Sequence, residues 1–338
     1  MQILVTGASR GIGRGIAIEL ALNGHNVYIT GRNQKTLDQV NQDAAKIAKT
    51  ENYPTFKNIT SLTCDHSNDD EVEQVFNKIP ELDCLVNNAY SGVNAIMEAN
   101  QQPFFQLPIT MWDELNNVGL RNNYRCCHHA VRKMMKINSS QNLSPNQTAT
   151  DTSAFVERRN AKKPGFIINI SSAGGAISIF NAAYGIGKEA KDRMMVDFGI
   201  ELAKHKTNIF AISLWPGAVK TETIMEQMEK DSSGNLKRIF QNGESTRFAG
   251  RCLAAVFDKM GEDNQSYVKF LNGGIVTTSD IGNKYNLKDV DNRVIPSTLG
   301  LNGILYAAGF RRAASWIPGW CKVPKWVFAL GTYGKRLR

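Results

Sequence analysis

Short apolar runs alternate with longer amphipathic stretches along most of the chain. The apolar runs predict strands at residues 2–6, 26–30, 61–64, 83–87, 165–171 and 209–215. The amphipathic stretches between them predict helices near residues 11–23, 34–48, 69–78, 111–136 and 182–204. Near-continuous apolar strands that alternate with helices are typical of a mostly parallel sheet covered by helices on both faces. The pattern therefore predicts a doubly wound, Rossmann-type α/β fold, with its ligand crevice at the carboxyl ends of the strands.

Two segments depart from this pattern. Residues 137–163 are polar and poor in apolar side chains, so we expect a surface loop inserted into the fold. Residues 291–338 combine cations with aromatic side chains and are interpreted as a C-terminal extension. Residues 1–290 are then expected to form one domain.

The net charge of +9 is concentrated in the extension. No acidic residue follows Asp291, whereas eight cations lie beyond it. A terminal block of positive charge favours a local surface for an anionic partner over nucleic acid binding. Residues 301–338 suit peripheral contact with a membrane, but an extension folded over the substrate crevice explains them equally well.

Other sequence features argue against disulfides, membrane spans and metals. The six cysteines include no CxxC pair, which favours free thiols in a reducing compartment. The chain begins directly with a strand-like run, so we expect no cleaved signal, and no apolar run reaches membrane-spanning length. The CCHH stretch at 126–129 cannot converge on one ion, because consecutive helical residues point about 100° apart. We therefore expect no metal site.

A glycine-rich turn links the first predicted strand to the first predicted helix. Gly7, Gly11 and Gly13 form the pattern G-x-x-x-G-x-G within VTGASRGIGRGIA. Glycines there allow a tight turn and close approach of backbone to a pyrophosphate, which the helix N-terminus attracts. The context predicts a dinucleotide site rather than a merely structural turn.

Coenzyme choice is expected at the end of the second strand. An acidic residue there would bind the ribose 2′-hydroxyl, but the stretch VYITGRNQ offers Arg32, and Arg10 lies in the glycine loop. Two guanidinium groups can hold a 2′-phosphate, which favours NADP(H). Alternatively, Arg32 is an ordinary solvated charge.

At this point the sequence resembles the short-chain dehydrogenase/reductase family. The matching pieces are TGASRGIG (6–13), CD (64–65), LVNNA (85–89), NISS (169–172), YGIGK (184–188) and WPGAVKT (215–221). They occur in the family's order over roughly residues 2–275. The resemblance implies an NADP-binding reductase domain in which Asp65 contacts the adenine, Asn87 braces the central strands and the 216–221 loop covers the nicotinamide and pyrophosphate. The coenzyme-binding residues that it implies are Gly7, Ser9, Arg10, Gly11, Ile12, Gly13, Arg32, Asp65, Asn88, Ala89, Tyr184, Lys188, Pro216, Gly217, Val219 and Thr221.

The chain resembles one member of the family more closely, and this resemblance extends into the C-terminal extension. It rests on VYITGRN, NNVGLR, KYNLKDVDNR and VPKW. It implies an NADPH-dependent carbonyl reductase of steroid and xenobiotic ketones that is associated with the endoplasmic reticulum; a cytoplasmic location is the alternative. Relatives often pair through their fourth and fifth helices, so a homo-oligomer is also possible.

Tyr184 and Lys188 supply the expected chemistry. Four residues apart on a helix, they project from one face. Hydride transfer to a ketone builds negative charge on its oxygen, and a positioned acid must supply a proton. A free tyrosine has a pKa of about 10, and a nearby ammonium group lowers it by stabilising the phenolate.

The serine that orients the carbonyl group is expected at the end of the 165–171 strand. We favour Ser172, because the family's serine is the second of the ISS pair. Ser172 lies twelve residues before Tyr184, whereas Ser171 has the family's usual spacing of thirteen. The choice of Ser172 therefore assumes a one-residue deletion.

Two positions depart from the family. Gly119 stands where many members have an asparagine that holds a water near the lysine, and Tyr90 stands where glycine is common and is expected to narrow the nicotinamide pocket. Two alternatives to ketone reduction remain open. One is reduction of 3-oxoacyl thioesters, and the other is a nucleotide-binding, membrane-associated scaffold in which Gly119 marks weakened catalysis.

Overall fold

The computed structural model describes residues 1–99, 102–137, 163–232, 234–259, 265–297, 300, 316–317 and 321. Its centre is a seven-stranded parallel sheet with the order β3-β2-β1-β4-β5-β6-β7. The strands are β1 (Gln2–Val5), β2 (Asn26–Gly31), β3 (Thr60–Thr63), β4 (Cys84–Asn87), β5 (Gly165–Ile170), β6 (Ile209–Trp215) and β7 (Ile275–Thr277). The strand order reverses between β1 and β4, which places the ligand crevice at their carboxyl ends. β7 was not expected from the sequence, because three residues carry little periodic signal.

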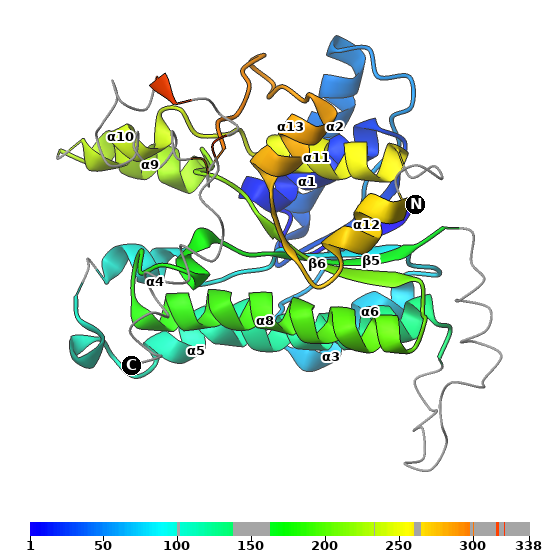
Figure 1. Ribbon diagram of the computed structural model, residues 1–338, viewed down its shortest axis with the longest axis horizontal. Helices are drawn as coiled ribbons and strands as arrows, with labels where there is room; N and C mark the ends of the chain where they lie inside the picture. Colours follow the sequence, from blue (N-terminus) through cyan, green and yellow to red (C-terminus); the bar gives the residue numbers. More distant parts are fainter. Residues whose placement is uncertain are drawn as a thin grey trace.

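Helices cover both faces of the sheet, as the doubly wound pattern predicts (Figure 1). One layer contains α1, α2, α11, α12 and α13, and the other contains α3, α5, α6 and α8. The helices are α1 (Gly11–Leu22), α2 (Gln34–Thr50), α3 (Asp69–Lys78), α4 (Val93–Glu98), η1 (Phe104–Gln106), α5 (Met111–Asn116), η2 (Asn117–Arg121), α6 (Asn122–Met134), η4 (Ala173–Gly175), α8 (Ala182–Lys204), α9 (Glu222–Lys230), α10 (Asn235–Phe240), α11 (Phe248–Asp258), α12 (Gln265–Leu271) and α13 (Thr278–Tyr285).

Alternate side chains of each central strand enter separate cores. Ile3 and Val5 of β1 belong to the core under α1 and α11. Leu4, between them, belongs to the core under α3, α6 and α8. Because both faces are buried, the strands carry continuous apolar runs rather than alternating ones.

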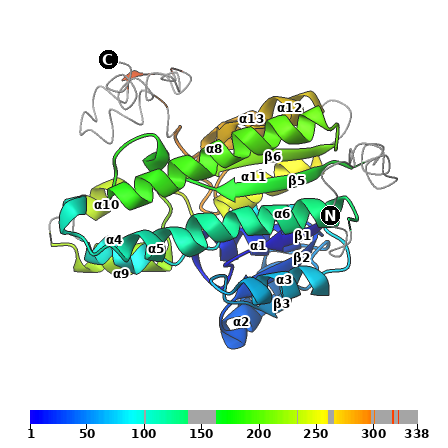
Figure 2. The same cartoon turned by 90° about the horizontal axis from the view of Figure 1, so that it is seen from below.

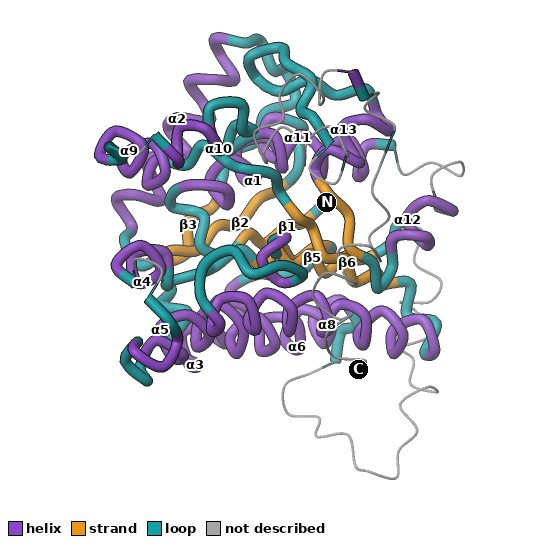
Figure 3. Tube along the Cα trace, turned by 60° about the vertical axis from the view of Figure 1, so that its left-hand side comes forward, coloured by secondary structure: helices purple, strands orange, loops and turns teal. Residues whose placement is uncertain are grey.

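The single helix expected at 111–136 is interrupted. α5 ends at Asn116, η2 is a π-helical turn, and α6 follows it. The Asn122 N–H bonds to the carbonyl of Asn117, five residues earlier. π-turns within helices are frequent at functional sites. This one lies beside α8 at the end of the sheet where α4, α5 and α9 gather (Figures 2 and 3).

The insertion and the extension fall mainly outside the described residues. The predictions for 137–163 and 301–338 therefore stay predictions, as does the domain boundary at residue 290. In the part of the chain that is described, no helix is both long and apolar enough to cross a bilayer. All six cysteines are free, and five are buried.

Candidate active site

The glycine loop joins β1 to α1 and needs glycine at two positions for steric reasons. Gly7 has a φ of +62°, in the left-handed region that favours glycine. A Cβ atom at Gly13 would lie 2.3 Å from the Asn88 side-chain nitrogen and 2.8 Å from the Gly7 carbonyl oxygen. Any larger residue at Gly13 would therefore displace the loop or the end of β4.

The ends of β4 and β2 hold this loop in place. The Thr6 hydroxyl accepts hydrogen bonds from the backbone N–H groups of Asn88 and Ala89, both at 3.0 Å. The Asn88 side chain donates to the carbonyl oxygens of Thr6 at 3.0 Å and Gly7 at 2.9 Å. The Thr30 hydroxyl, in β2, accepts from the Gly7 N–H at 3.1 Å. The structure thus brings Asn88 and Ala89 to the loop on which the sequence placed the coenzyme.

The first turn of α1 presents backbone N–H groups to the crevice. Ile12 lies in this turn, Ser9 precedes it, and Arg10 is exposed at its start. The carboxylate of Glu222 accepts a hydrogen bond from the Gly11 N–H at 2.9 Å. A negative group at the N-terminus of a helix is favoured by the helix dipole and the unpaired N–H groups. The Glu222 carboxylate therefore stands in for the phosphate of a dinucleotide, and sequence reasoning did not anticipate it.

The segment after β6 covers the glycine loop. It contains four of the predicted coenzyme residues, Pro216, Gly217, Val219 and Thr221. A Cβ atom at Gly11 would lie 3.6 Å from the Thr221 methyl group, so the two loops are in contact. The buried Glu244 carboxyl accepts hydrogen bonds from the Gly217 N–H and, at 2.6 Å, from the Thr278 hydroxyl. Burial raises the pKa of Glu244 to about 8.

Arg32 and Asp65 lie at the carboxyl ends of neighbouring strands. β2 and β3 pair up to Gly31 and Thr63; Arg32 follows Gly31 directly, and Asp65 lies two residues beyond Thr63. Hydrogen bonds from Ser67 lower the pKa of Asp65, and the positive charge of Arg32 adds to this effect. The structure therefore brings a cation and a carboxylate to the place predicted for the adenosine half of the coenzyme.

Tyr184, Lys188 and Ser172 meet at the start of α8. The Asn181 side chain caps this helix by accepting from the Tyr184 N–H at 2.9 Å, which fixes the first turn. The Lys188 ammonium nitrogen lies 5.6 Å from the centroid of the Tyr184 ring. Burial raises the pKa of Tyr184, and a hydrogen bond with Ser172 opposes this rise.

The two candidate serines point in different directions. Ser171 is buried, and its hydroxyl donates to the Lys188 carbonyl oxygen at 3.2 Å. Ser172 is the residue that reaches the Tyr184 phenol, and its hydroxyl also accepts from the Gly174 N–H at 3.1 Å. Of the two serines, Ser172 therefore contacts the Tyr184 phenol, whereas Ser171 holds α8 against β5.

The charge of Lys188 is set by groups around it. Burial lowers its pKa to about 8, and the negative charge of Asp192 opposes this effect. Asp192 accepts hydrogen bonds from the Ser213 hydroxyl and, at 3.1 Å, from the Trp215 indole N–H. A titratable pair with shifted pKa values beside a nucleotide loop is typical of a catalytic site.

Comparison with known proteins agrees with this geometry. A family model described as short chain dehydrogenase matches residues 1–232. The chain belongs to the short-chain dehydrogenase family. Human and mouse dehydrogenase/reductase SDR family member 1 are each 34% identical to it, over 97% of this chain and 96% and 95% of theirs.

More distant relatives are found among sequences and solved structures. A 3-oxoacyl-[acyl-carrier-protein] reductase from Aquifex aeolicus is 31% identical over 39% of this chain and 50% of that protein. The crystal structure of a short-chain type dehydrogenase/reductase from Mycobacterium marinum matches with a TM-score of 0.59 at 18% identity, over 82% of this chain and 92% of that one. This likeness confirms the doubly wound fold.

Membership of the family makes this short-chain dehydrogenase an oxidoreductase that uses a nicotinamide coenzyme. The residues present fit such a coenzyme. The glycine loop leaves no room for side chains at Gly7 or Gly13, and a carboxylate already occupies the Gly11 N–H. Bound there, the coenzyme would supply the hydride, and the Tyr184 and Lys188 pair lies at the same edge of the sheet.

The π-turn of this short-chain dehydrogenase brings Asn116, which sequence reasoning could not orient, against α8. Its side chain donates to the Ala183 carbonyl oxygen at 3.2 Å. A Cβ atom at Gly187 would lie only 2.0 Å from its Oδ1 atom, so Gly187 lets the two helices approach. Asn116 therefore ties α5 to the turn of α8 that carries Tyr184 and Lys188.

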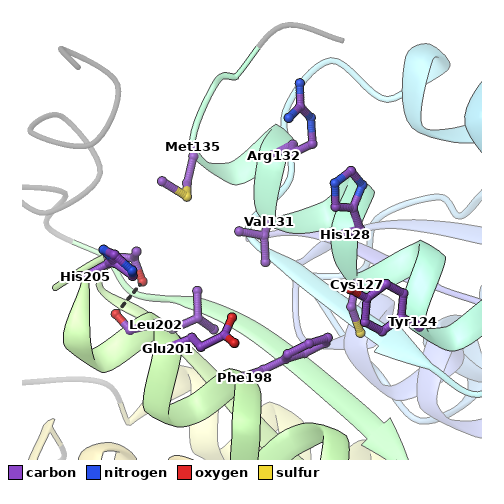
Figure 4. Close-up of a pocket in the computed structure, with 11 residues that line it drawn as sticks. Tyr124, Cys127, His128, Val131, Arg132, Met135, Phe198, Glu201, Leu202 and His205 are labelled. Atoms are coloured by element: carbon purple, nitrogen blue, oxygen red, sulfur yellow. Dashed lines mark hydrogen bonds between the residues drawn. The ribbon is translucent and has the colours of Figure 1, made fainter. Parts of the chain in front are cut away.

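The CCHH stretch at 126–129 lies on α6, outside the candidate active site. Cys126 and Cys127 are buried, and His129 stacks on Phe76. No cluster of three or more potential metal ligands occurs within the described ranges. His128 lines a groove of about 240 Å³ between α6 and the second half of α8 (Figure 4). The groove lies near the opposite end of α8 from Tyr184, so it is not part of the candidate active site.

Proposed function

We propose that this oxidoreductase is an NADPH-dependent carbonyl reductase that also catalyses the reverse oxidation of secondary alcohols. The observation that carries the proposal is the meeting of Ser172, Tyr184 and Lys188 beside the glycine loop. Ser172 orients the carbonyl oxygen, and Tyr184 gives it a proton as hydride reaches the carbon. Lys188 stabilises the resulting phenolate.

The preference for NADPH rests on Arg10 and Arg32. Both side chains are exposed at the carboxyl edge of the sheet, near the adenosine end of the nucleotide site. Guanidinium groups bind phosphate in a bidentate manner, so the pair suits a 2′-phosphate.

The proposed substrates are bulky apolar ketones, of the steroid or xenobiotic type. Phe180 packs edge-on against Tyr184, with ring centroids 5.0 Å apart. Ile177 and Ile179 are partly exposed on the same segment, and Met225 is exposed on α9. Apolar walls around a few polar groups are typical of sites for such ligands.

The test measures NADPH and NADH oxidation with a panel of steroid and aromatic ketones. The wild-type protein should turn over part of the panel and prefer NADPH. Tyr184→Phe should lower turnover by about 10²- to 10⁴-fold, the usual contribution of a positioned acid, while NADPH still binds. Normal turnover by this variant would refute the assignment of Tyr184.

Two other functions are decided by the same panel. Reduction of 3-oxoacyl thioesters is supported by the likeness to the acyl-carrier-protein reductase, and turnover of acyl-carrier substrates but not steroids would establish it. A nucleotide-binding scaffold, the possibility raised by Gly119, predicts NADPH binding without turnover of any substrate.

We also propose a location and an assembly for the protein. The basic, aromatic residues 301–338 support peripheral contact with the endoplasmic reticulum membrane over a purely cytoplasmic location. Tyr124 and Ile200 are exposed on the outer face of α6 and α8, which supports a homo-oligomer through that face.

A further inference from the structure

Tyr90 is a partly buried aromatic residue that the reaction described above does not use. It follows β4 by three residues, and its ring faces the Lys188 ammonium nitrogen, 4.9 Å from the ring centroid. The centroid of the Tyr184 ring lies 5.6 Å from the same nitrogen. The two rings meet edge to face, with centroids 6.4 Å apart. The lysine charge is therefore within cation–π distance of two aromatic rings.

Gly119 makes room for the Tyr90 ring. A Cβ atom at Gly119 would lie 2.7 Å from Cδ2 and 2.8 Å from Cε2 of that ring. Any other residue at position 119 would therefore push the Tyr90 ring away from Lys188. Gly119, which the scaffold alternative treats as a mark of weakened catalysis, therefore provides the space that the Tyr90 ring occupies.

The hydroxyl group of Tyr90 does not explain why the residue is there. It is buried and has no hydrogen-bond partner among the described residues. Burial, with a smaller contribution from Tyr184, raises the pKa of Tyr90, so it stays a neutral phenol. A buried polar atom without a partner is costly, which indicates that the aromatic ring is the functional part.

Several groups on the elements around Lys188 act on its charge. Asp192, on the same helix, favours the ammonium form of Lys188. Burial and the charge of Lys188 lower the pKa of the neighbouring Lys191. Tyr184 is neutral at ordinary pH, and the Asn116 amide approaches α8 from α5. The negative face of the Tyr90 ring is the contribution from the β4–α4 segment.

We propose that Tyr90, seated against Gly119, is a positioning residue that keeps Lys188 charged and in place beside Tyr184. This rests on the proposed function, because a charged Lys188 matters there by stabilising the phenolate. Tyr90 touches neither reacting atom and acts through the lysine.

The test compares Tyr90→Leu, which removes the ring, with Tyr90→Phe, which removes only the hydroxyl group. The titration of Lys188 is followed in the full-length protein by NMR of carbon-labelled lysine, with its signal assigned from Lys188→Arg. Tyr90→Leu should lower the pKa of Lys188 by about half to one unit, whereas Tyr90→Phe should leave it unchanged. An unchanged titration in Tyr90→Leu, or equal shifts in both variants, would overturn the proposal.

Gly119→Ala provides an independent check that leaves Tyr90 itself unchanged. The added methyl group displaces the ring, so this variant should reproduce the lowered pKa. In the Tyr90→Leu background it should add nothing further, because no ring remains to be displaced. An additional shift in that background would show that Gly119 acts by another route.

Catalysis gives a second readout. Where a ketone is turned over, the fall of kcat/KM toward high pH should begin at lower pH in Tyr90→Leu than in the wild type or Tyr90→Phe. If no ketone is reduced, the proposed function fails, but the lysine titration still decides the role of Tyr90.

Discussion

The glycine loop and the start of α8 lie at the same edge of the sheet, but different kinds of contact shape them. The glycine loop is fixed by backbone geometry: a left-handed Gly7, a close approach at Gly13 and hydrogen bonds to backbone groups of β4. The start of α8 has ordinary helical geometry. Its special property is the charge state of Lys188, which burial and Asp192 affect and whose ammonium nitrogen lies 4.9 Å from the centroid of the Tyr90 ring.

This difference explains why the two regions respond differently to substitution. A change in the glycine loop should alter coenzyme binding, because the loop shape itself is the binding site. A change around α8 should alter the chemical step while the coenzyme still binds. The experiments below separate these two effects.

Among the experiments that compare the two regions, the largest effect is expected at Ser172. Ser172→Ala removes the hydroxyl beside Tyr184 and should lower kcat/KM for ketones by about 10²- to 10³-fold, the usual cost of losing one donor to a developing oxyanion. NADPH affinity, measured by fluorescence titration, should not change.

Ser171→Ala is the matched control. It loses the hydrogen bond to the Lys188 carbonyl, so the free energy of unfolding should fall by about 1 kcal/mol. Turnover should fall far less than in Ser172→Ala. The reverse order of effects would assign catalysis to Ser171, the residue with the usual spacing.

A smaller effect is expected on the coenzyme-binding side of the site, at Arg32. Arg32→Ala should weaken NADPH binding by about 10- to 100-fold, the range expected for a hydrogen bond between charged groups, and leave NADH binding unchanged. Dissociation constants for both coenzymes provide the measurement. An equal loss of affinity for NADPH and NADH would mean that Arg32 does not bind the 2′-phosphate.

The sequence was informative where structure depends on local geometry. Six strands, the glycine loop and the Tyr184–Lys188 spacing could all be predicted, because each is a short pattern with a fixed backbone consequence. The helix predicted near residues 69–78 is also confirmed, because α3 spans Asp69–Lys78.

The surroundings of Lys188 could not be predicted in this way. Tyr90 and Gly119 were noted as departures, but their contact depends on how the β4–α4 segment meets the π-turn. Asn116 could not be oriented, because a π-turn changes the direction of the side chains around it. Glu222 lies 211 residues from Gly11 along the chain, and no local pattern joins them.

Glu244, which lies under the loop that covers the glycine turn, should make the free energy of unfolding depend on pH. Its pKa is raised from 4.5 to about 8 in the folded protein, so between these values the folded state holds a proton that the unfolded state has lost. The contribution of Glu244 is therefore complete below pH 4.5 and falls by up to about 1.4 kcal/mol per pH unit as pH rises toward 8.

Urea unfolding at pH 6, 7 and 8 measures this contribution. The difference in unfolding free energy between wild type and Glu244→Gln should change in favour of the variant as pH rises, because glutamine stays neutral. Histidines such as His66, whose pKa is lowered by burial, titrate in both proteins, so their contributions cancel in the difference. A constant difference would show that Glu244 does not hold a proton in the folded protein.

The smallest effect is expected at Glu222, where the two regions of the site come together through α9. Its carboxylate occupies the Gly11 N–H that a pyrophosphate needs, so the coenzyme must displace it. Glu222→Gln should therefore tighten NADPH binding about two- to five-fold at low salt, as expected for removing a charge at a helix terminus, and less at high salt. Glu226→Gln, one turn further along α9, is the control and should have no effect. Weaker binding by Glu222→Gln would instead show that the carboxylate holds the covering loop in its binding position.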